Sequence, residues 1–121
     1  MSRSTEVPNS VDLKLRLLVG GDLPYKWQVY EYPATGGPPI ALPGGAGRGD
    51  ERVAIAGLPP QQTRRFVWSV AAVNLNDEQE VDVRVQALAT DIVVGELAAT
   101  WKVGRTTSSC FVHLDLTARA S

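Results

Sequence analysis

Few residues in this sequence have the types and spacing that catalysis requires, and the most suggestive group lies in its last fifteen residues. The sequence has a single histidine, His113, and Asp115 follows two positions later. On a β-strand, side chains two positions apart share a face. Ser108, Ser109 and Thr117 lie close by and could supply a nucleophile. The chain lacks a Gly-x-Ser-x-Gly elbow. We therefore predict that the protein is not an enzyme, with a small hydrolase around His113 and Asp115 as the least favoured function.

Metal-ligating side chains are too few for a structural zinc site, which needs four Cys or His ligands. The chain offers one of each, Cys110 and His113, and their separation of three places them on opposite faces of a strand. A looser calcium site could use Asp77, Glu78 and Asp82. Polar residues of this kind are more typical of a solvated turn, so we expect no bound metal.

A glycine-rich run at 44–50 could suggest a phosphate-binding loop. Such a loop requires Lys followed by Ser or Thr before a helix, whereas here the acidic pair Asp50 and Glu51 follows and would repel phosphate. The dinucleotide fingerprint also fails, because the preceding strand and the following helix are missing. Residues 48–50 spell the adhesion tripeptide Arg-Gly-Asp, which we interpret as coincidence in a polar loop. We predict no cofactor.

Aromatic residues on predicted outward faces are the remaining candidates for function. Tyr30 and Tyr32 share a strand parity with Gln28, which gives an amphipathic patch. Phe111 and His113 lie on the outward parity of the last strand. Cross-strand packing would also explain the two tyrosines, since Tyr is common in strands. The alternative is a contact surface for a protein or a sugar ring. The candidate partner-binding residues are Gln28, Tyr30, Tyr32, Phe111 and His113.

The element that must position these residues is a two-armed apolar segment at 65–89. From Glu80 onward, apolar and polar residues alternate without a break, which is the pattern of a half-buried strand. The arm at 65–75 is apolar on both parities, as expected for a more enclosed strand. A short polar break between the arms predicts an antiparallel hairpin.

Five further segments show the same period of two. The predicted strands are 11–19, 25–32, 52–57, 65–75, 80–89, 92–103 and 110–118. In 92–103 the helix formers of 96–99 compete, but the flanking β-branched residues favour a strand, with Val93 inward and Gly95 at a bulge. The tryptophans Trp27, Trp68 and Trp101 fall on inward or doubly apolar positions and are predicted to lie in the core.

About seven strands separated by turns and no helix predict an all-β, antiparallel β-sandwich of immunoglobulin-like or jelly-roll-like architecture. Residues 1–10 read as a flexible tail, and 11–121 as a single domain. A long loop at 33–49 holds six glycines and four prolines. Within it, the apolar residues 40–42 could form a short edge strand or pin the loop to the core.

The overall composition argues against two classes of partner. With 12 Lys and Arg against 13 Asp and Glu, the net charge is -1, so nucleic acid and membrane surfaces are not expected partners. A single cysteine and the lack of a signal peptide or membrane-spanning run favour a soluble, cytoplasmic protein, with leaderless export left open.

A complete core pattern beside so few catalytic residues predicts a non-catalytic binding module. Its partner is predicted to be a protein or a second copy of itself, because the outward Phe111 and the doubly apolar strand would leave apolar surface to be covered. The alternative is a leaderless carbohydrate-binding module that uses Gln28, Tyr30 and Tyr32 with the long loop.

Overall fold

The computed structural model describes residues 2–74, 77–105 and 107–120, which form nine β-strands and no helix. The strands are β1 (Ser2–Val7), β2 (Leu13–Val19), β3 (Tyr25–Tyr32), β4 (Ile40–Ala46), β5 (Asp50–Ile55), β6 (Thr63–Val73), β7 (Gln79–Ala89), β8 (Ile92–Val103) and β9 (Thr107–Ala118). The all-β prediction is confirmed, with nine strands where about seven were expected. The predicted strand end at Leu75 and the loop residue Asn76 lie outside the described residues.

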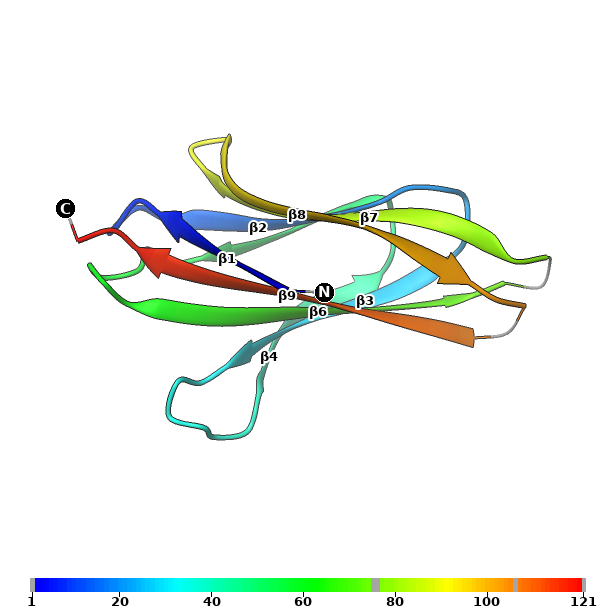
Figure 1. The fold of residues 1–121 in the computed structure, drawn as a ribbon, viewed down its shortest axis with the longest axis horizontal. Helices are drawn as coiled ribbons and strands as arrows, with labels where there is room; N and C mark the ends of the chain where they lie inside the picture. Colours follow the sequence, from blue (N-terminus) through cyan, green and yellow to red (C-terminus); the bar gives the residue numbers. More distant parts are fainter. Residues whose placement is uncertain (1, 75–76, 106, 121) are drawn as a thin grey trace.

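The strands form two sheets packed face to face, which confirms a sandwich. One sheet has five strands in the order β1-β9-β6-β3-β4, and the other has four in the order β5-β2-β7-β8. Figure 1 shows the two layers, with β2, β7 and β8 in one and β1, β9, β6 and β3 in the other. The pairings within the sheets are antiparallel apart from β1 with β9, which is parallel.

The predicted hairpin at 65–89 is wrong, although both of its strands exist. Strand β6 pairs with β3 and β9 in one sheet, while β7 pairs with β2 and β8 in the other. The chain therefore arches across the sandwich, and the apolar faces of β6 and β7 meet in the core instead of the strands sharing a ladder. Each is an interior strand of its own sheet, which explains why both are so apolar.

The core is built from the alternating inward side chains of both sheets. In β2 the inward residues Leu13, Leu15 and Leu17 are buried, and the polar residues between them are not. Trp68 and Trp101 are buried as predicted. Trp27 packs against the core but is only half-buried, because β3 is covered on one side by the short edge strand β4 alone.

The N-terminal segment is a strand and not the flexible tail that we expected. Residues 2–7 pair with His113 to Ala118 of β9, and Val7 at the end of β1 is completely buried. Arg3 donates a side-chain hydrogen bond to the carbonyl of Glu96 in the other sheet at 2.9 Å. Backbone pairing with β9 and this cross-sheet contact hold a segment whose side chains are otherwise mostly exposed.

The long loop at 33–49 is also shorter than predicted. Residues 40–46 form the edge strand β4, which pairs with β3 and continues past the expected 40–42. An extra residue in β4 opposite Gln28 to Tyr30 makes a bulge that accommodates Pro43, a residue that cannot donate to a ladder. Figure 1 shows the turn before β4 standing away from the two layers.

Strand β8 carries a bulge that changes which of its residues face inward. Ala87 pairs with Gly95, but the next residue of β7, Leu88, pairs with Val93, so Val94 is the extra residue. The prediction that Val93 faces inward is wrong, since the bulge reverses the parity on that side and leaves Val93 46% exposed. The strand itself, which we preferred over a helix, is confirmed.

Candidate functional site

The structure brings all five candidate residues onto one surface, the outer face of the five-stranded sheet. Tyr30 lies opposite Val67, which lies opposite His113 on the next strand. In the neighbouring row Gln28, Ser69 and Phe111 are in register, and in the row on the other side Tyr32, Arg65 and Asp115 are. We call the outward residues of β3, β6 and β9 the aromatic face: Lys26, Gln28, Tyr30, Tyr32, Arg65, Val67, Ser69, Ala71, Ser109, Phe111, His113 and Asp115.

The aromatic face has a dry centre and exposed rings around it. Val67 is only 3% exposed although it points away from the core. Its flanking partners Tyr30 and His113 are half-buried, as expected for side chains that lean over a small central residue. Phe111 and Tyr32 are 55% and 42% exposed. This surface therefore exposes aromatic rings to solvent, and covering them with a partner would be favourable.

Gln28 has a structural task at the edge of this face. Its side-chain amide donates to the carbonyl of Val29 at 3.0 Å and to the carbonyl of Leu42. Leu42 lies in the β4 bulge, where regular ladder pairing is interrupted. The Gln28 amide thus supplies a donor to a backbone carbonyl in the bulge, and its hydrogen atoms are directed at the protein's own backbone.

His113 and Asp115 lie on the same face, as predicted, but Asp115 has a different partner. Its Oδ1 accepts a hydrogen bond from Nε of Arg65 at 3.1 Å. Among the described residues, neither His113 nor Asp115 is hydrogen bonded to a hydroxyl that could act as a nucleophile. Asp115 therefore orients the Arg65 guanidinium, and the described residues around His113 do not form a triad arrangement.

A hollow of about 610 Å³ lies at the Tyr32 end of the aromatic face. Tyr32, Arg65 and Thr63 form its sheet side, and the turn at 33–37 forms its other side. Gly36 donates its N–H to the carbonyl of Pro33 at 3.1 Å and has a positive φ of 80°, a conformation that favours glycine. The hollow therefore combines an aromatic ring, a guanidinium and a hydroxyl beside a tight turn.

The outer face of the four-stranded sheet has a different character. Arg16 donates to both oxygens of Asp50, at 3.0 and 2.7 Å, and Arg84 lies 3.6 Å from Glu96. Gln86 also donates to Glu96, at 2.7 Å. The Arg16 hydrogen bonds hold the pKa of Asp50 below its usual range. Paired charges at the centre of this face are typical of an ordinary solvated surface.

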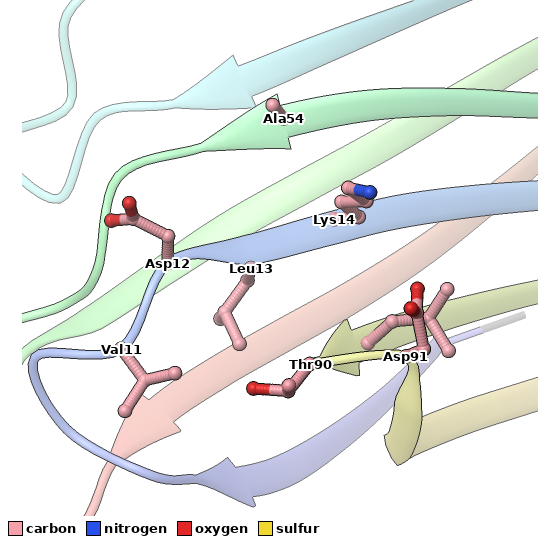
Figure 2. Close-up of a pocket in the computed structure, with 8 residues that line it drawn as sticks. Val11, Asp12, Leu13, Lys14, Ala54, Thr90 and Asp91 are labelled. Carbon is pink, nitrogen blue, oxygen red and sulfur yellow. The ribbon is translucent and has the colours of Figure 1, made fainter.

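A hollow of about 490 Å³ at one end of the four-stranded sheet holds a second group of polar residues (Figure 2). Asp12, just before β2, lines one side of it, and Thr90 and Asp91 of the β7–β8 turn line another. Asp12 accepts a hydrogen bond from the backbone N–H of Gly57 at 3.0 Å and so holds the neighbouring loop. The polar residues here belong to the turns, and within the described ranges no three His, Cys, Asp or Glu side chains are grouped to hold a metal ion.

A buried pair of oxygens links the two sheets at the start of β5. Tyr25 donates its hydroxyl hydrogen to Glu51, and the Glu51 carboxylate also accepts from the backbone N–H of Arg48 at 3.1 Å. The N–H of Gly49 donates to the Tyr25 oxygen at 2.7 Å. Burial and the hydrogen bond to Glu51 raise the pKa of Tyr25 to about 12. These bonds fix the loop at 47–49, where the chain crosses between the sheets.

Comparison with known proteins supports the fold. The structure is similar to the crystal structure of a DUF4425 family protein from Bacteroides ovatus, with a TM-score of 0.58 and 11% sequence identity. The match covers 88% of this chain and 96% of that one. At this identity the likeness concerns the fold alone. No protein-family model and no curated protein matches the sequence.

Two features near the site were not predicted from the sequence: the buried Glu51 and the pairing of Arg65 with Tyr32. Glu51 lies on the same parity as the inward Val53 and Ile55, so the alternation itself placed a carboxylate inside. The alignment of Arg65 with Tyr32 had no such signal, because it depends on the register between β3 and β6.

Among the described residues, no helix is long and apolar enough to span a membrane.

Proposed function

We propose that this chain is a non-catalytic module that binds protein through the aromatic face, with self-association as its simplest form. The observation that carries the proposal is the placing of Tyr30, Tyr32 and Phe111 around the dry Val67 on one sheet. Interfaces are enriched in Tyr, Phe and Arg at their centres. We also place the module in the cytoplasm, where its buried free thiol at Cys110 would stay reduced.

The contrast between the two outer faces supports this assignment. The four-stranded sheet presents ion pairs at its centre and exposed aliphatic residues at the β8 end, Ile92 and Val93, whereas the five-stranded sheet presents aromatic rings around Val67. Desolvating paired charges is costly, while covering apolar rings is favourable. A partner therefore gains more by covering the aromatic face than by covering the opposite one.

Sedimentation velocity from micromolar to millimolar concentration tests self-association. We expect a concentration-dependent rise in mean mass, which Phe111→Ser weakens at least about tenfold because the most exposed aromatic ring of the face is lost. Ile92→Ser is the matched control, since Ile92 is 67% exposed on the other sheet. Equal effects of the two substitutions, or a strict monomer throughout, would contradict self-association through the aromatic face.

A carbohydrate-binding module is the second candidate, and the hollow beside Tyr32 favours it. A sugar ring could stack on the half-exposed tyrosine and hydrogen bond to Thr63 and Arg65. A glycan array read at millimolar sensitivity tests this. A hit that Tyr32→Ala abolishes would support the sugar-binding alternative, and a blank array would remove it.

A further inference from the structure

We infer that the hollow between Tyr32 and Arg65 seats an acidic side chain of a partner protein. This inference rests on the proposed function and names the chemistry of the partner. Tyr32 and Arg65 are directly opposite in the β3–β6 register, so their side chains leave the sheet as neighbours. Both also line the hollow of about 610 Å³.

The guanidinium of Arg65 is oriented but still has donors to offer. Asp115 accepts from Nε at 3.1 Å, and the Arg65 side chain is 60% exposed. A guanidinium carries five N–H donors in a fixed plane. Within the described chain, Asp115 is the carboxylate that contacts Arg65, and it takes the Nε edge. The terminal nitrogens are left to recognise a second carboxylate.

The neighbouring residue, Arg64, shows what a structural arginine looks like in this fold. It donates from Nε to Glu31 at 2.8 Å and from Nη2 to the other oxygen of the same carboxylate. Its guanidinium carbon lies 5.2 Å from the centre of the Phe66 ring, and its side chain is 21% exposed. Arg64 is satisfied inside the protein, whereas Arg65 points outward beside an exposed ring.

Charge on the aromatic face selects an acidic partner. The face carries two cations, Lys26 and Arg65, against one carboxylate, Asp115, which is already paired. No carboxylate of the described residues lies within ion-pair distance of Lys26. An incoming carboxylate would contact the Arg65 guanidinium beside its pair with Asp115. Lys26, six residues from Tyr32 along β3, gives the face as a whole a net positive charge, which also speeds association.

A protein segment fits this surface better than a glycan does. The row of Tyr30, Val67 and His113 lies next to the row of Tyr32 and Arg65 in the sheet, so a peptide anchored at Arg65 could continue over the buried Val67. An extended peptide that alternates acidic and apolar side chains matches both parts. Tyr and Arg are also the residue types that most often dominate protein-binding energy.

The test measures fluorescence anisotropy of a labelled peptide of alternating Glu and Val with a central Tyr. Two comparison probes are the same peptide with Lys in place of Glu, and an oligogalacturonate. We expect the acidic peptide to bind and the Lys peptide to bind at least about tenfold more weakly. Arg65→Ala should weaken the acidic peptide by about tenfold, while Arg65→Lys restores only part of the loss because it cannot bind bidentately.

Arg84→Ala is the matched control for this experiment. Arg84 is 53% exposed and is likewise paired through Nε with a carboxylate, but it lies on the opposite face. Its removal should leave the affinity unchanged. Equal binding of the acidic and Lys peptides, an equal loss in Arg65→Ala and Arg84→Ala, or binding of oligogalacturonate alone would overturn the inference.

The outcome is separable from that of the proposed function. If the acidic peptide fails to bind while self-association still depends on Phe111, the acidic-partner inference falls and the protein-binding face stands. Thermal melting of Arg65→Ala keeps the result interpretable. An exposed ion pair such as Arg65–Asp115 contributes little to stability, so the variant is expected to remain folded and to melt close to the native chain.

Discussion

The buried Tyr25–Glu51 pair is the most tightly specified chemistry at the scale of single residues. The carboxylate accepts hydrogen bonds from a phenol and from the backbone of the loop at 47–49. Both residues are less than a tenth exposed. Buried carboxylate oxygens are costly to leave without hydrogen-bond donors. The Tyr25–Glu51 pair therefore fixes firmly the short segment at 47–49 that crosses between the sheets.

Stability should fall at high pH because of Tyr25. Its pKa is about 12 in the folded chain and ordinarily 10, so the folded state holds the phenol proton more tightly. The associated stability is fully present below pH 10 and is lost as pH rises towards 12. A rise of the pKa from 10 to about 12 corresponds to a loss of about 2–3 kcal/mol, and little of it is screened because Tyr25 is buried.

Urea unfolding at a series of pH values measures this loss, with Tyr25→Phe as the comparison. The variant should be about 1–2 kcal/mol less stable at neutral pH, since Glu51 loses a donor. Its free energy of unfolding should also fall less above pH 10 than that of the native chain, because the Tyr25 phenol is absent. A decline of the same size in Tyr25→Phe would contradict the assignment.

Gly47 provides a second prediction at this scale. A Cβ added there would lie 2.2 Å from the Tyr25 ring, which the Glu51 hydrogen bond keeps from moving. We expect Gly47→Ala to destabilise the protein by about 1–3 kcal/mol through overpacking. Gly45→Ala is the control, because a Cβ there meets nothing within 4 Å. Similar unfolding midpoints for the two variants would show that the ring can give way.

At the scale of elements, the β7–β8 hairpin contains a turn that its residues do not favour. Thr90 and Asp91 both have positive φ, 51° and 64°, between the paired residues Ala89 and Ile92. A two-residue turn with both φ positive is type I′, for which Asn-Gly is the preferred sequence. A β-branched residue such as Thr90 is strained there.

Replacing the turn with Thr90→Asn and Asp91→Gly should therefore stabilise the protein. We expect a gain of about 1 kcal/mol, seen as a higher melting temperature, because two left-handed non-glycine residues are relieved. Thr90→Val keeps the β-branch and replaces the hydroxyl with a methyl group, so it should give no gain. A double variant that melts no higher than the native chain would argue against strain in this turn.

Strand β1 offers another prediction for an element, since Val7 is its completely buried residue. Val7→Ala should cost about 2 kcal/mol and loosen the parallel pairing with β9. Hydrogen exchange should show faster exchange at residues 113–118 than in β2 or β7. Ser4→Ala, an exposed change on the same strand, should leave these rates as they are; matching rates in both variants would contradict the anchoring role of Val7.

Elements show where sequence reasoning succeeded and where it stopped. Alternation in β2, β7 and β9 identified the strands and their inward faces, because one face of each is buried and the period is fixed at two. Alternation is blind to whether consecutive strands pair or face each other, so β6 and β7 were joined into a hairpin that does not exist. Strand β1 was missed because it has no stripe of apolar residues for a sequence pattern to reveal. Backbone pairing with β9 and the single buried residue Val7 hold it instead.

In the candidate site, too, the sequence predicts which face each side chain takes but not which strands lie side by side. The outward parities of Tyr30, Tyr32, Phe111 and His113 could be predicted from their own strands. That β3 and β9 flank β6, and so place these residues on one surface, is a property of the strand order and not of any local pattern. Arg65 gains its significance from the same pairing, through Tyr32 on one side and Asp115 on the other.

At the scale of the whole molecule, the sandwich has two outer faces that differ in what they offer a partner. One carries ion pairs and a few exposed aliphatic residues at its β8 end, and the other is the aromatic face with its dry centre. The proposed function depends on this asymmetry. It predicts that contacts with other protein molecules concentrate on one sheet and leave the other accessible.

Fluorine NMR of the chain labelled with 4-fluorophenylalanine tests this claim most directly, because the sequence has two phenylalanines. Phe66 is completely buried and serves as the internal reference, and Phe111 is 55% exposed on the aromatic face, in the row next to Val67. As protein concentration rises, we predict that the Phe111 resonance shifts, broadens and loses its response to exchanging H₂O for D₂O, while Phe66 stays constant. A Phe111 resonance that keeps its position and solvent response up to millimolar concentration would contradict self-association through the aromatic face.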